Sequence, residues 1–231
     1  KNKKQMKIHS EIQVVSDISN FLKDYFIEVN NIYLNSRKII LIRHSKTLLN
    51  DGSFLGQKRD PSIDDTFEFN KKIYDLVFDD YKTISSPQKR AKETLNHLGI
   101  DDFQLDDRLK EFNYGKAEGM FFDDIISEFP FIEKDIKNQL DFRFPEGENY
   151  TDLLLRMNDL LSENNDDLIL LTHQGPIRAI IGSIIELPIH LWHQIEIPYT
   201  YPIEIIYLNE IPTLNIDRKK FRELFKNFEG M

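Results

Sequence analysis

The stretch KIILIRH (residues 38–44) joins a short apolar run to an arginine and a histidine. Four consecutive Ile and Leu residues are too few for a buried helix and are typical of a strand buried on both faces of a parallel sheet. A second run of this kind, LILLT (168–172), is also followed by a histidine, His173. Ligands of open α/β sheets bind outside the carboxyl ends of the strands, so His44 and His173 are candidates for one site. A single histidine at a strand end is more often structural. The prediction of a functional site therefore depends on the presence of two such histidines.

Helical spacing and strand-like runs alternate along the rest of the chain. Further strands are predicted at 82–85 and 203–208. Helices are predicted over 66–78, 88–98, 122–137 and 150–163, from about Pro176 onward, and over 217–228. Strands that alternate with helices predict an α/β fold with a mostly parallel sheet.

The first 36 residues form a separate region in this interpretation, a helical extension ahead of a domain that spans 37–231. Within 11–29, apolar residues recur at helical spacing: Val15, Ile18, Leu22, Phe26 and Val29. The pattern predicts an amphipathic helix that packs on the main body; the alternative is a contact with a homodimer mate or with a fused or partner domain. The chain begins with Lys1 rather than Met, as expected for a fragment of a longer protein.

Composition excludes several classes of function. The 231 residues carry a formal net charge of −9, with 40% hydrophobic and 30% charged residues and no basic run, so nucleic acid is not an expected partner. No apolar stretch is long enough to span a membrane, and no apolar core follows the basic start as in a signal peptide. The absence of cysteine excludes disulfides and thiolate chemistry and suits a reducing cytoplasm, the expected location.

Two more segments carry candidate chemistry. ISSPQKRAKETL (84–95) predicts a strand, a turn and a helix whose first turn holds Arg90, and the free N–H groups of such a helix start favour an anion. LKEFNYGKAEGM (109–120) places Glu111 and Glu118 in a glycine-punctuated loop. Taken alone, Arg90 would be a surface residue and either glutamate a solvated carboxylate.

The order of these pieces is more specific than any one of them. Arg-His follows the first strand, Asn lies six residues beyond the histidine, and then come GQ (56–57), SSPxxRAxxT, LxExxxGxxEG, EGEN…R and a strand ending in histidine. This order resembles the histidine phosphatase superfamily, which has the phosphoglycerate mutase-like fold, over roughly residues 38–208. The resemblance implies a three-layer α/β/α sandwich with a mostly parallel central sheet.

The resemblance also implies roles for these residues. His44 would be the nucleophile that forms a phosphohistidine, and Glu111 would donate a proton to the leaving group. A cationic pocket of Arg43, Arg90 and His173 would surround the phosphoryl group, with Asn50 and Gln57 as further phosphate-binding residues. Phosphoryl transfer needs an in-line nucleophile and charge stabilisation on the equatorial oxygens, and guanidinium forks suit phosphate geometry. Glu111 can act as an acid only when protonated, which a dianionic substrate nearby would favour.

No metal or other cofactor is expected. His190 and His193 lie three apart in HLWHQ, a spacing that a pair of metal ligands could use, but the sequence offers no third ligand nearby. The phosphohistidine route that the resemblance implies uses no metal.

Particular residues also point to a branch of the family. Only 37 positions separate Glu111 from Glu148, too few for the insertion that mutases carry, which favours a phosphatase. Gln174, Arg178 and Tyr150 match the positions that hold the sugar phosphate in the fructose-2,6-bisphosphatase branch, although Tyr150 and Arg178 could equally be structural. EFNYGKAEG and FPEGEN are also similar to α-ribazole phosphatases and broad-specificity phosphatases.

Other positions depart from those patterns. Gln139 and Asp135 stand where the fructose-2,6-bisphosphatase branch has cations, and Phe122 where it has tyrosine, which weakens the case for that substrate. Ser45-Lys46 replaces the usual Gly-Glu after the nucleophile. We therefore expect a metal-independent phosphomonoesterase acting on a small phosphorylated metabolite. The alternatives are a phosphoglycerate mutase-type transferase and a catalytically weak phospho-ligand or protein-binding domain.

Overall fold

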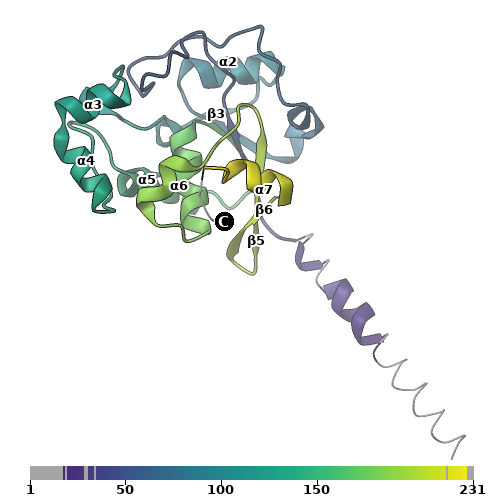
Figure 1. Cartoon of the computed structure of the whole chain (residues 1–231). Helices are drawn as coiled ribbons and strands as arrows, with labels where there is room; N and C mark the ends of the chain where they lie inside the picture. The colour runs from purple at the N-terminus through teal and green to yellow at the C-terminus, as the bar shows by residue number, and fades with distance from the viewer. Residues whose placement is uncertain (1–17, 19, 29–30, 34, 217, 228–231) are drawn as a thin grey trace, which may run out of the picture.

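A six-stranded sheet forms the centre of the molecule (Figure 1). The computed structural model describes residues 18, 20–28, 31–33, 35–216 and 218–227. The strand order is β3-β2-β4-β1-β5-β6. In chain order the strands are β1 (Lys38–Arg43), β2 (Lys82–Ser85), β3 (Gln104–Leu105), β4 (Leu168–Thr172), β5 (Pro202–Leu208) and β6 (Ile211–Asn215). The first four in the sheet are parallel, while β5 and β6 are antiparallel to their neighbours, which confirms a mostly parallel sheet.

Alternation of side chains along β1 divides the core into two layers. Ile39 and Leu41 point to the face covered by α5 (Tyr150–Glu163) and α6 (Gln174–Ile184). Ile40 and Ile42 point to the opposite face, where they pack with α2 (Lys89–His97). Because both faces are covered, the interior residues of β1 and β4 are apolar and buried. The result is the predicted α/β/α sandwich.

Most of the predicted elements are present. The predicted 88–98 and 150–163 helices are α2 and α5, and α6 begins at Gln174 with Pro176 in its first turn. The last helix, α7, spans Arg218–Leu224, while residues 217 and 228 of that prediction lie outside the described residues. Strand β6 was not predicted: it is an edge strand containing Pro212, paired with β5 through a turn in which Asn209 and Glu210 have φ of 49° and 67°.

The helix predicted over 66–78 is wrong. This segment holds one 3-10 turn, η1 (Lys71–Asp75), in which the side chain of Asn70 accepts a hydrogen bond from the N–H of Lys72. The chain is extended again at Leu76, and a second 3-10 turn follows, η2 (Phe78–Asp80). Phe69 and Ile73 are buried whereas Tyr74 and Val77 are exposed, so the apolar residues do not share one helical face.

The helix predicted over 122–137 is divided in two, α3 (Phe122–Glu128) and α4 (Pro130–Lys137). Phe129 between them has φ −125° and ψ 70°. The ring of Pro130 disfavours the helical conformation in the residue before it, but its fixed φ suits the first position of a new helix. The remaining 3-10 turns are η3 (Asp107–Leu109), η4 (Gly115–Ala117) and η5 (Ile189–Gln194).

The N-terminal segment extends away from the sheet (Figure 1). Residues 20–28 and 31–33 are helical, while Val15 and Val29 of the predicted apolar face lie outside the described residues. Ile18, Leu22 and Phe26 are exposed at 54%, 45% and 65%, so the prediction that this face packs on the main body is wrong for them. At its carboxyl end the helical segment meets the domain, where Ile27 and Ile32 line a hollow with Asn165 and Tyr207. Within the described part of the chain, no helix is both long and apolar enough to cross a membrane.

Candidate active site

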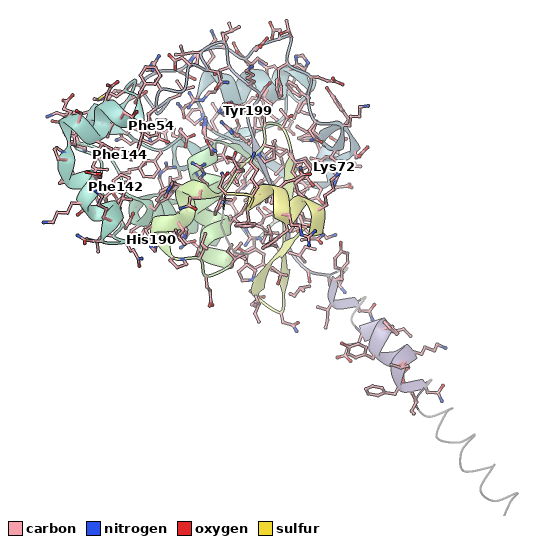
Figure 2. The ribbon with its side chains drawn as sticks, in the orientation of Figure 1. Phe54, Lys72, Phe142, Phe144, His190 and Tyr199 are labelled. Carbon is pink, nitrogen blue, oxygen red and sulfur yellow. The ribbon has the colours of Figure 1, made fainter. Side chains whose placement is uncertain are left out.

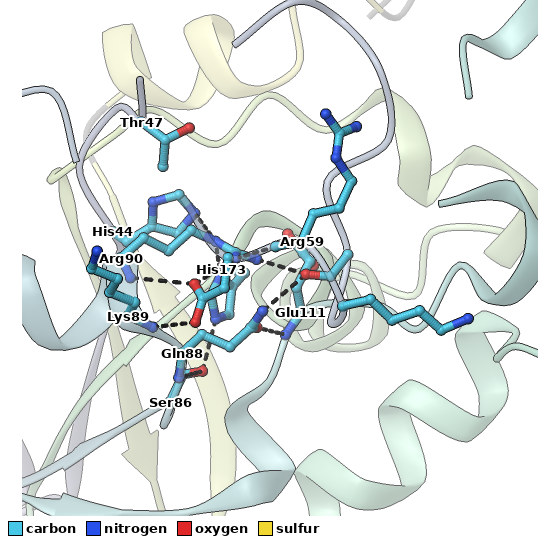
Figure 3. A network of polar contacts seen from close by, with 12 residues as sticks. His44, Thr47, Arg59, Ser86, Gln88, Lys89, Arg90, Glu111 and His173 are labelled. Carbon is cyan, nitrogen blue, oxygen red and sulfur yellow. Dashed lines mark hydrogen bonds and ion pairs between the residues drawn. The ribbon is translucent and has the colours of Figure 1, made fainter. Parts of the chain in front are cut away.

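Three neighbouring strands deliver the central side chains. His44 follows β1, His173 follows β4 and Ser86 follows β2, and these strands lie side by side in the order β2-β4-β1. The parallel register continues one residue past the strands, because the N–H of His44 donates to the carbonyl of Thr172. The two imidazole rings are therefore 4.9 Å apart, centroid to centroid (Figure 3).

His44 is held in one tautomer. Its Nδ1 lies 2.6 Å from the carbonyl oxygen of Ser45, which can only accept, so Nδ1 carries the proton. Its Nε2 accepts a hydrogen bond from Nε of Arg90 at 3.3 Å. Burial, followed by the charges of Arg90 and Arg43, holds the pKa of His44 well below its usual range. The ring is consequently neutral, with an unprotonated Nε2 facing the site.

His173 is also neutral but has the opposite tautomer. Its Nδ1 accepts from the same Nε of Arg90 at 3.2 Å, which leaves Nε2 to donate to the hydroxyl of Ser86 at 2.8 Å. Burial and then the charge of Arg90 hold the pKa of His173 well below its usual range. The two histidines thus share one donor, the Nε–H of Arg90.

Arg90 lies in the first turn of α2 and is fully buried. Its guanidinium is hydrogen-bonded to the loop of residues 56–60. Its Nη2 donates to the carbonyl of Gly56 at 3.0 Å, and its Nη1 donates to the carbonyl of Arg59 and to Asp60. Burial lowers the pKa of Arg90, while the nearby Glu111 and Asp60 oppose that effect. The carboxylate of Asp60 also accepts from the N–H of Lys89 at 2.6 Å. The helix start that the sequence suggested for an outside anion is therefore occupied by Asp60.

Glu111 lies opposite the histidines in a buried loop. Its Oε1 accepts from the N–H groups of Phe112 and Gly175 at 2.8 and 2.9 Å, and its own N–H donates to Gln88. A Cβ at Gly175 would lie 2.5 Å from Oε1, so glycine at this position allows the carboxylate to approach α6. A residue with a side chain at position 175 would displace the carboxylate of Glu111, which explains the glycine at this position.

A half-buried ion pair supports the loop that carries Glu111. Nε of Arg156 is 2.9 Å from Glu148, and the same guanidinium donates to the carbonyl of Glu111. Glu148 also accepts from the N–H of Asn113. The EGEN…R part of the motif is thus structural: it holds the backbone on which the acid sits.

Aromatic rings surround this loop. Tyr114 stacks on Phe54 and Phe112, and Phe144 meets Tyr114 edge-on at 5.1 Å. Figure 2 places Phe54 and Phe144 on the side of the molecule that α3 and α4 occupy. Burial, and then the charge of Glu111, raises the pKa of Tyr114 well above its usual range. These rings keep water from one side of Glu111, which strengthens electrostatic interactions there.

Arg43 lies on the other side of His44. Its Nη1 donates to the carbonyl of Ile197 at 2.7 Å, and its guanidinium carbon lies 3.8 Å from the ring centroid of Tyr199. Among the described residues its Nε is buried without a hydrogen-bond partner. Burial lowers the pKa of Arg43, and the neighbouring Tyr199 and Glu111 oppose this effect.

Five other residues were predicted to bind substrate or phosphate: Gln57, Tyr150, Arg178, Gln174 and Asn50. The side-chain amide of Gln57 donates to the carbonyl of Glu111 at 2.7 Å, so it supports the loop. Tyr150 lies near Arg178: burial raises the pKa of Tyr150, and the charge of Arg178 opposes this effect. Nε of Arg178 also donates to the carbonyl of Ile195. Gln174, at the start of α6, is half-buried, and Asn50 is exposed near the hydroxyl of Tyr199.

Several site residues were missed from the sequence, namely Asp60, Ser86, Gln88, Tyr114 and Tyr199. Ser86 and Gln88 lie inside the quoted SSPxxR segment, so proximity to Arg90 was their signal. Tyr199 and Asp60 belong to segments that the motif does not include, and only the tertiary fold brings them to the site.

Solved structures of several phosphatases have the same fold as this chain. A mutant phosphoserine phosphatase of Entamoeba histolytica in complex with phosphoserine has a TM-score of 0.64 at 20% identity, covering 78% of this chain and 95% of that one. A mycobacterial glucosyl-3-phosphoglycerate phosphatase has a TM-score of 0.59 at 17% identity, covering 79% and 98%.

Curated relatives are larger proteins. Fructose-2,6-bisphosphatase of Saccharomyces cerevisiae is 27% identical over 186 residues, which are 76% of this chain and 40% of the relative. Human 6-phosphofructo-2-kinase/fructose-2,6-bisphosphatase 4 is 26% identical over 210 residues, 82% of this chain and 44% of the relative. The chain thus spans less than half the length of these proteins. The model of the histidine phosphatase superfamily (branch 1) matches residues 39–215, which include all the site residues above. The chain belongs to that superfamily.

Proposed function

We propose that this chain is a metal-independent phosphomonoesterase that acts on small phosphorylated metabolites through a phosphohistidine on His44. One observation carries the proposal: the hydrogen bond to Ser45 places the proton of His44 on Nδ1 and leaves Nε2 unprotonated, facing the Nε–H of Arg90 at 3.3 Å. An imidazole needs this arrangement to act as a nucleophile at neutral pH.

In the first step, Nε2 of His44 forms a bond to phosphorus as the bond from phosphorus to the ester oxygen breaks. The leaving oxygen takes a proton from Glu111, and the alcohol departs. Both backbone donors reach Oε1 of Glu111, so we assign the transferred proton to Oε2. A dianionic substrate beside the carboxyl favours its protonated form.

In the second step, water attacks phosphorus and the bond to Nε2 breaks. Glu111 now accepts a proton from the water and returns to its starting state, so the net reaction is ester plus water giving alcohol plus inorganic phosphate. His44 regains a free Nε2.

Charge stabilisation comes from three groups. Arg43 with its unpartnered Nε, Arg90 between the two rings and the Nε2–H of His173 are aimed at the equatorial oxygens of the transferred phosphoryl group. His173 shifts its donor from Ser86 to the phosphoryl group. These groups supply the roles that a metal would otherwise fill, which is the reason to expect activity in the presence of chelator.

The substrate class follows from what lies beyond the phosphoryl group. Arg178 and Tyr150 lie close enough to Arg43, Tyr114 and Glu111 for their charges to interact, so they form a polar subsite next to Glu111. A metabolite with a second anionic or hydroxyl-rich group would suit it. Fructose 2,6-bisphosphate, phosphoserine and glucosyl-3-phosphoglycerate are the first candidates, because they occur in the names of related proteins.

The test is phosphate release from these compounds and from p-nitrophenyl phosphate, with excess EDTA. His44→Ala is the decisive variant, and His190→Ala is its matched control, since His190 lies on η5 outside the polar network. We expect full activity of the wild type and of the control in EDTA, and none from His44→Ala. Wild-type turnover by His44→Ala would overturn the mechanism. Isomerised ester instead of free phosphate would identify a mutase, and tight phosphate binding without labelling of His44 would identify a binding domain.

A further inference from the structure

Tyr199 has an unusually fixed place at the edge of the site. It precedes β5, in a loop that is tied to the end of β1 because the N–H of Thr200 donates to the carbonyl of Arg43 at 2.9 Å. Thr200 is fully buried, and its hydroxyl accepts from the N–H of Asn70 at 2.8 Å. The loop therefore cannot swing away from Arg43 without breaking buried hydrogen bonds.

The ring of Tyr199 covers one face of the Arg43 guanidinium at 3.8 Å. The same loop supplies the carbonyl of Ile197, which binds Nη1 of Arg43 at 2.7 Å. A ring on the face and a carbonyl in the plane together fix the orientation of a guanidinium. The buried Nε then has no partner among the described residues and remains available to a phosphoryl oxygen.

The hydroxyl of Tyr199 reaches a second phosphate-binding candidate. It donates to Oδ1 of Asn50 at 3.4 Å. An amide group has a donor end and an acceptor end, and only the donor end can bind a phosphate oxygen. A phenol that donates to Oδ1 selects the orientation in which the NH₂ group of Asn50 faces the site. The ring of Tyr199 meanwhile lies 6.0 Å from that of His44, between these two partners.

We infer that Tyr199 is a positioning residue for phosphoryl transfer: its ring aligns Arg43 and its hydroxyl orients Asn50 toward the same phosphoryl group. The inference rests on the proposed function, since it assigns Arg43 and Asn50 to the phosphoryl oxygens. Tyr199 itself forms no bond to the phosphoryl group and acts through the two residues that do.

The experiment separates the ring from the hydroxyl. Tyr199→Phe keeps the ring over Arg43, whereas Tyr199→Leu removes both contacts. Phe67→Leu is the matched control, because Phe67 packs edge-on against Tyr199 at 5.7 Å and so tests mere loosening of the loop. For each protein, calorimetry measures the affinity for orthovanadate, and steady-state kinetics with p-nitrophenyl phosphate gives kcat and KM. Thermal melting checks that the variant is folded.

We expect Tyr199→Leu to weaken vanadate binding and lower kcat/KM about tenfold, and Tyr199→Phe about threefold, with Phe67→Leu within about twofold of wild type. In an Asn50→Ala background, Tyr199→Phe should have no further effect, because Asn50, the one hydrogen-bond partner of the hydroxyl among the described residues, is already absent.

Two results would overturn the inference: wild-type vanadate affinity and kcat/KM in Tyr199→Leu, or equal losses in Tyr199→Leu and Phe67→Leu. The vanadate arm keeps this failure separate from that of the proposed function. A wild type that binds vanadate with the expected order of variants but releases no phosphate would support the positioning role and contradict the phosphatase. Normal turnover in every Tyr199 variant would contradict the positioning role and support the phosphatase.

Discussion

His44 and His173 share one donor: Nε of Arg90 lies 3.3 Å from Nε2 of the first and 3.2 Å from Nδ1 of the second. A single N–H cannot satisfy both acceptors fully, so one ring nitrogen is always under-bonded. An incoming phosphoryl group ends this competition by accepting from Arg90 itself and freeing Nε2 of His44 to attack.

The acid limb of the pH profile should lie well below the usual titration range of histidine. The pKa of His44 is lowered, and the neutral ring is the active form, so activity is lost only when pH falls below that lowered value. We expect kcat/KM to stay flat as pH falls through about 6.5, the ordinary histidine value. Arg90→Gln removes a charge that lowers the pKa and should move the limb upward, while Arg59→Gln should leave it in place. A wild-type limb centred near the ordinary value would contradict this prediction.

Stability should fall as the medium is acidified. The pKa values of both buried histidines are lowered in the folded state, so below about 6.5 the unfolded chain binds protons that the folded chain does not. Each histidine then contributes a loss of about 1.4 kcal/mol per pH unit. Urea unfolding between pH 7 and 5 measures the slope, which should be shallower in His173→Asn than in the control His97→Asn. Equal slopes would mean that His173 takes up its proton in the folded state.

Asp60→Asn should impair catalysis through Arg90. The substitution removes the charge that holds Nη1 of Arg90 at 3.1 Å and that caps the N–H of Lys89. A shift of the guanidinium away from the two rings should lower kcat/KM about tenfold or more. Steady-state kinetics with p-nitrophenyl phosphate measures the effect, and the exposed Asp65→Asn serves as control. Unchanged kinetics would show that the carbonyls of Gly56 and Arg59 suffice to hold Arg90.

Gly175→Ala should displace the proton donor. The new Cβ would lie 2.5 Å from Oε1 of Glu111, inside contact distance, so the carboxyl must move. We expect kcat to fall about 100-fold, with smaller losses for substrates whose leaving group needs no proton, such as p-nitrophenyl phosphate. Gly99→Ala is the comparison: its φ of 72° strains an alanine, but no atom lies within 4 Å, so stability should fall while kcat stays. An equal fall in kcat for both ester classes would argue against acid catalysis by Glu111.

Arg178→Gln should change substrate preference. Arg178 donates to the carbonyl of Ile195 and lies near Tyr150 beside the site, so we place it against the second polar group of a metabolite. Loss of one charge-assisted contact should raise KM for such a substrate roughly 10- to 100-fold and leave KM for p-nitrophenyl phosphate nearly unchanged. Lys134→Gln on α4 is the control. An equal rise for both substrates would place Arg178 at the transferred phosphoryl group instead.

The sequence predicted the elements whose burial is uniform. β1, β4 and α5 are apolar on every face or on one clear stripe, and each appears where its pattern placed it. Prediction failed where burial depended on tertiary contacts, as in 66–78, whose apolar residues point in several directions around one turn. Phe129–Pro130 carried the signal for a break, but helical spacing on both sides concealed it.

The site was predictable in its core and not at its edges. His44, His173, Arg90 and Glu111 lie in motifs whose order could be recognised, and the fold brings them together. Asp60 contacts Arg90, and Tyr199 contacts Arg43. Both residues lie in loops, and no local sequence pattern predicts where a loop will pass in the folded protein. Gln57 lies in a motif, but its side chain binds the backbone of Glu111. A motif identifies a residue that matters without telling which atoms that residue will contact.

The orientation of β1 also has a consequence for attachment. The strand begins at Lys38, where the backbone N–H donates to Asp167, and it ends beside His44, with a rise that separates the two ends by roughly 20 Å. The N-terminal segment joins the sheet at the first of these ends (Figure 1). Any chain joined ahead of residue 37 would therefore connect at the opposite end of β1 from His44, the proposed nucleophile.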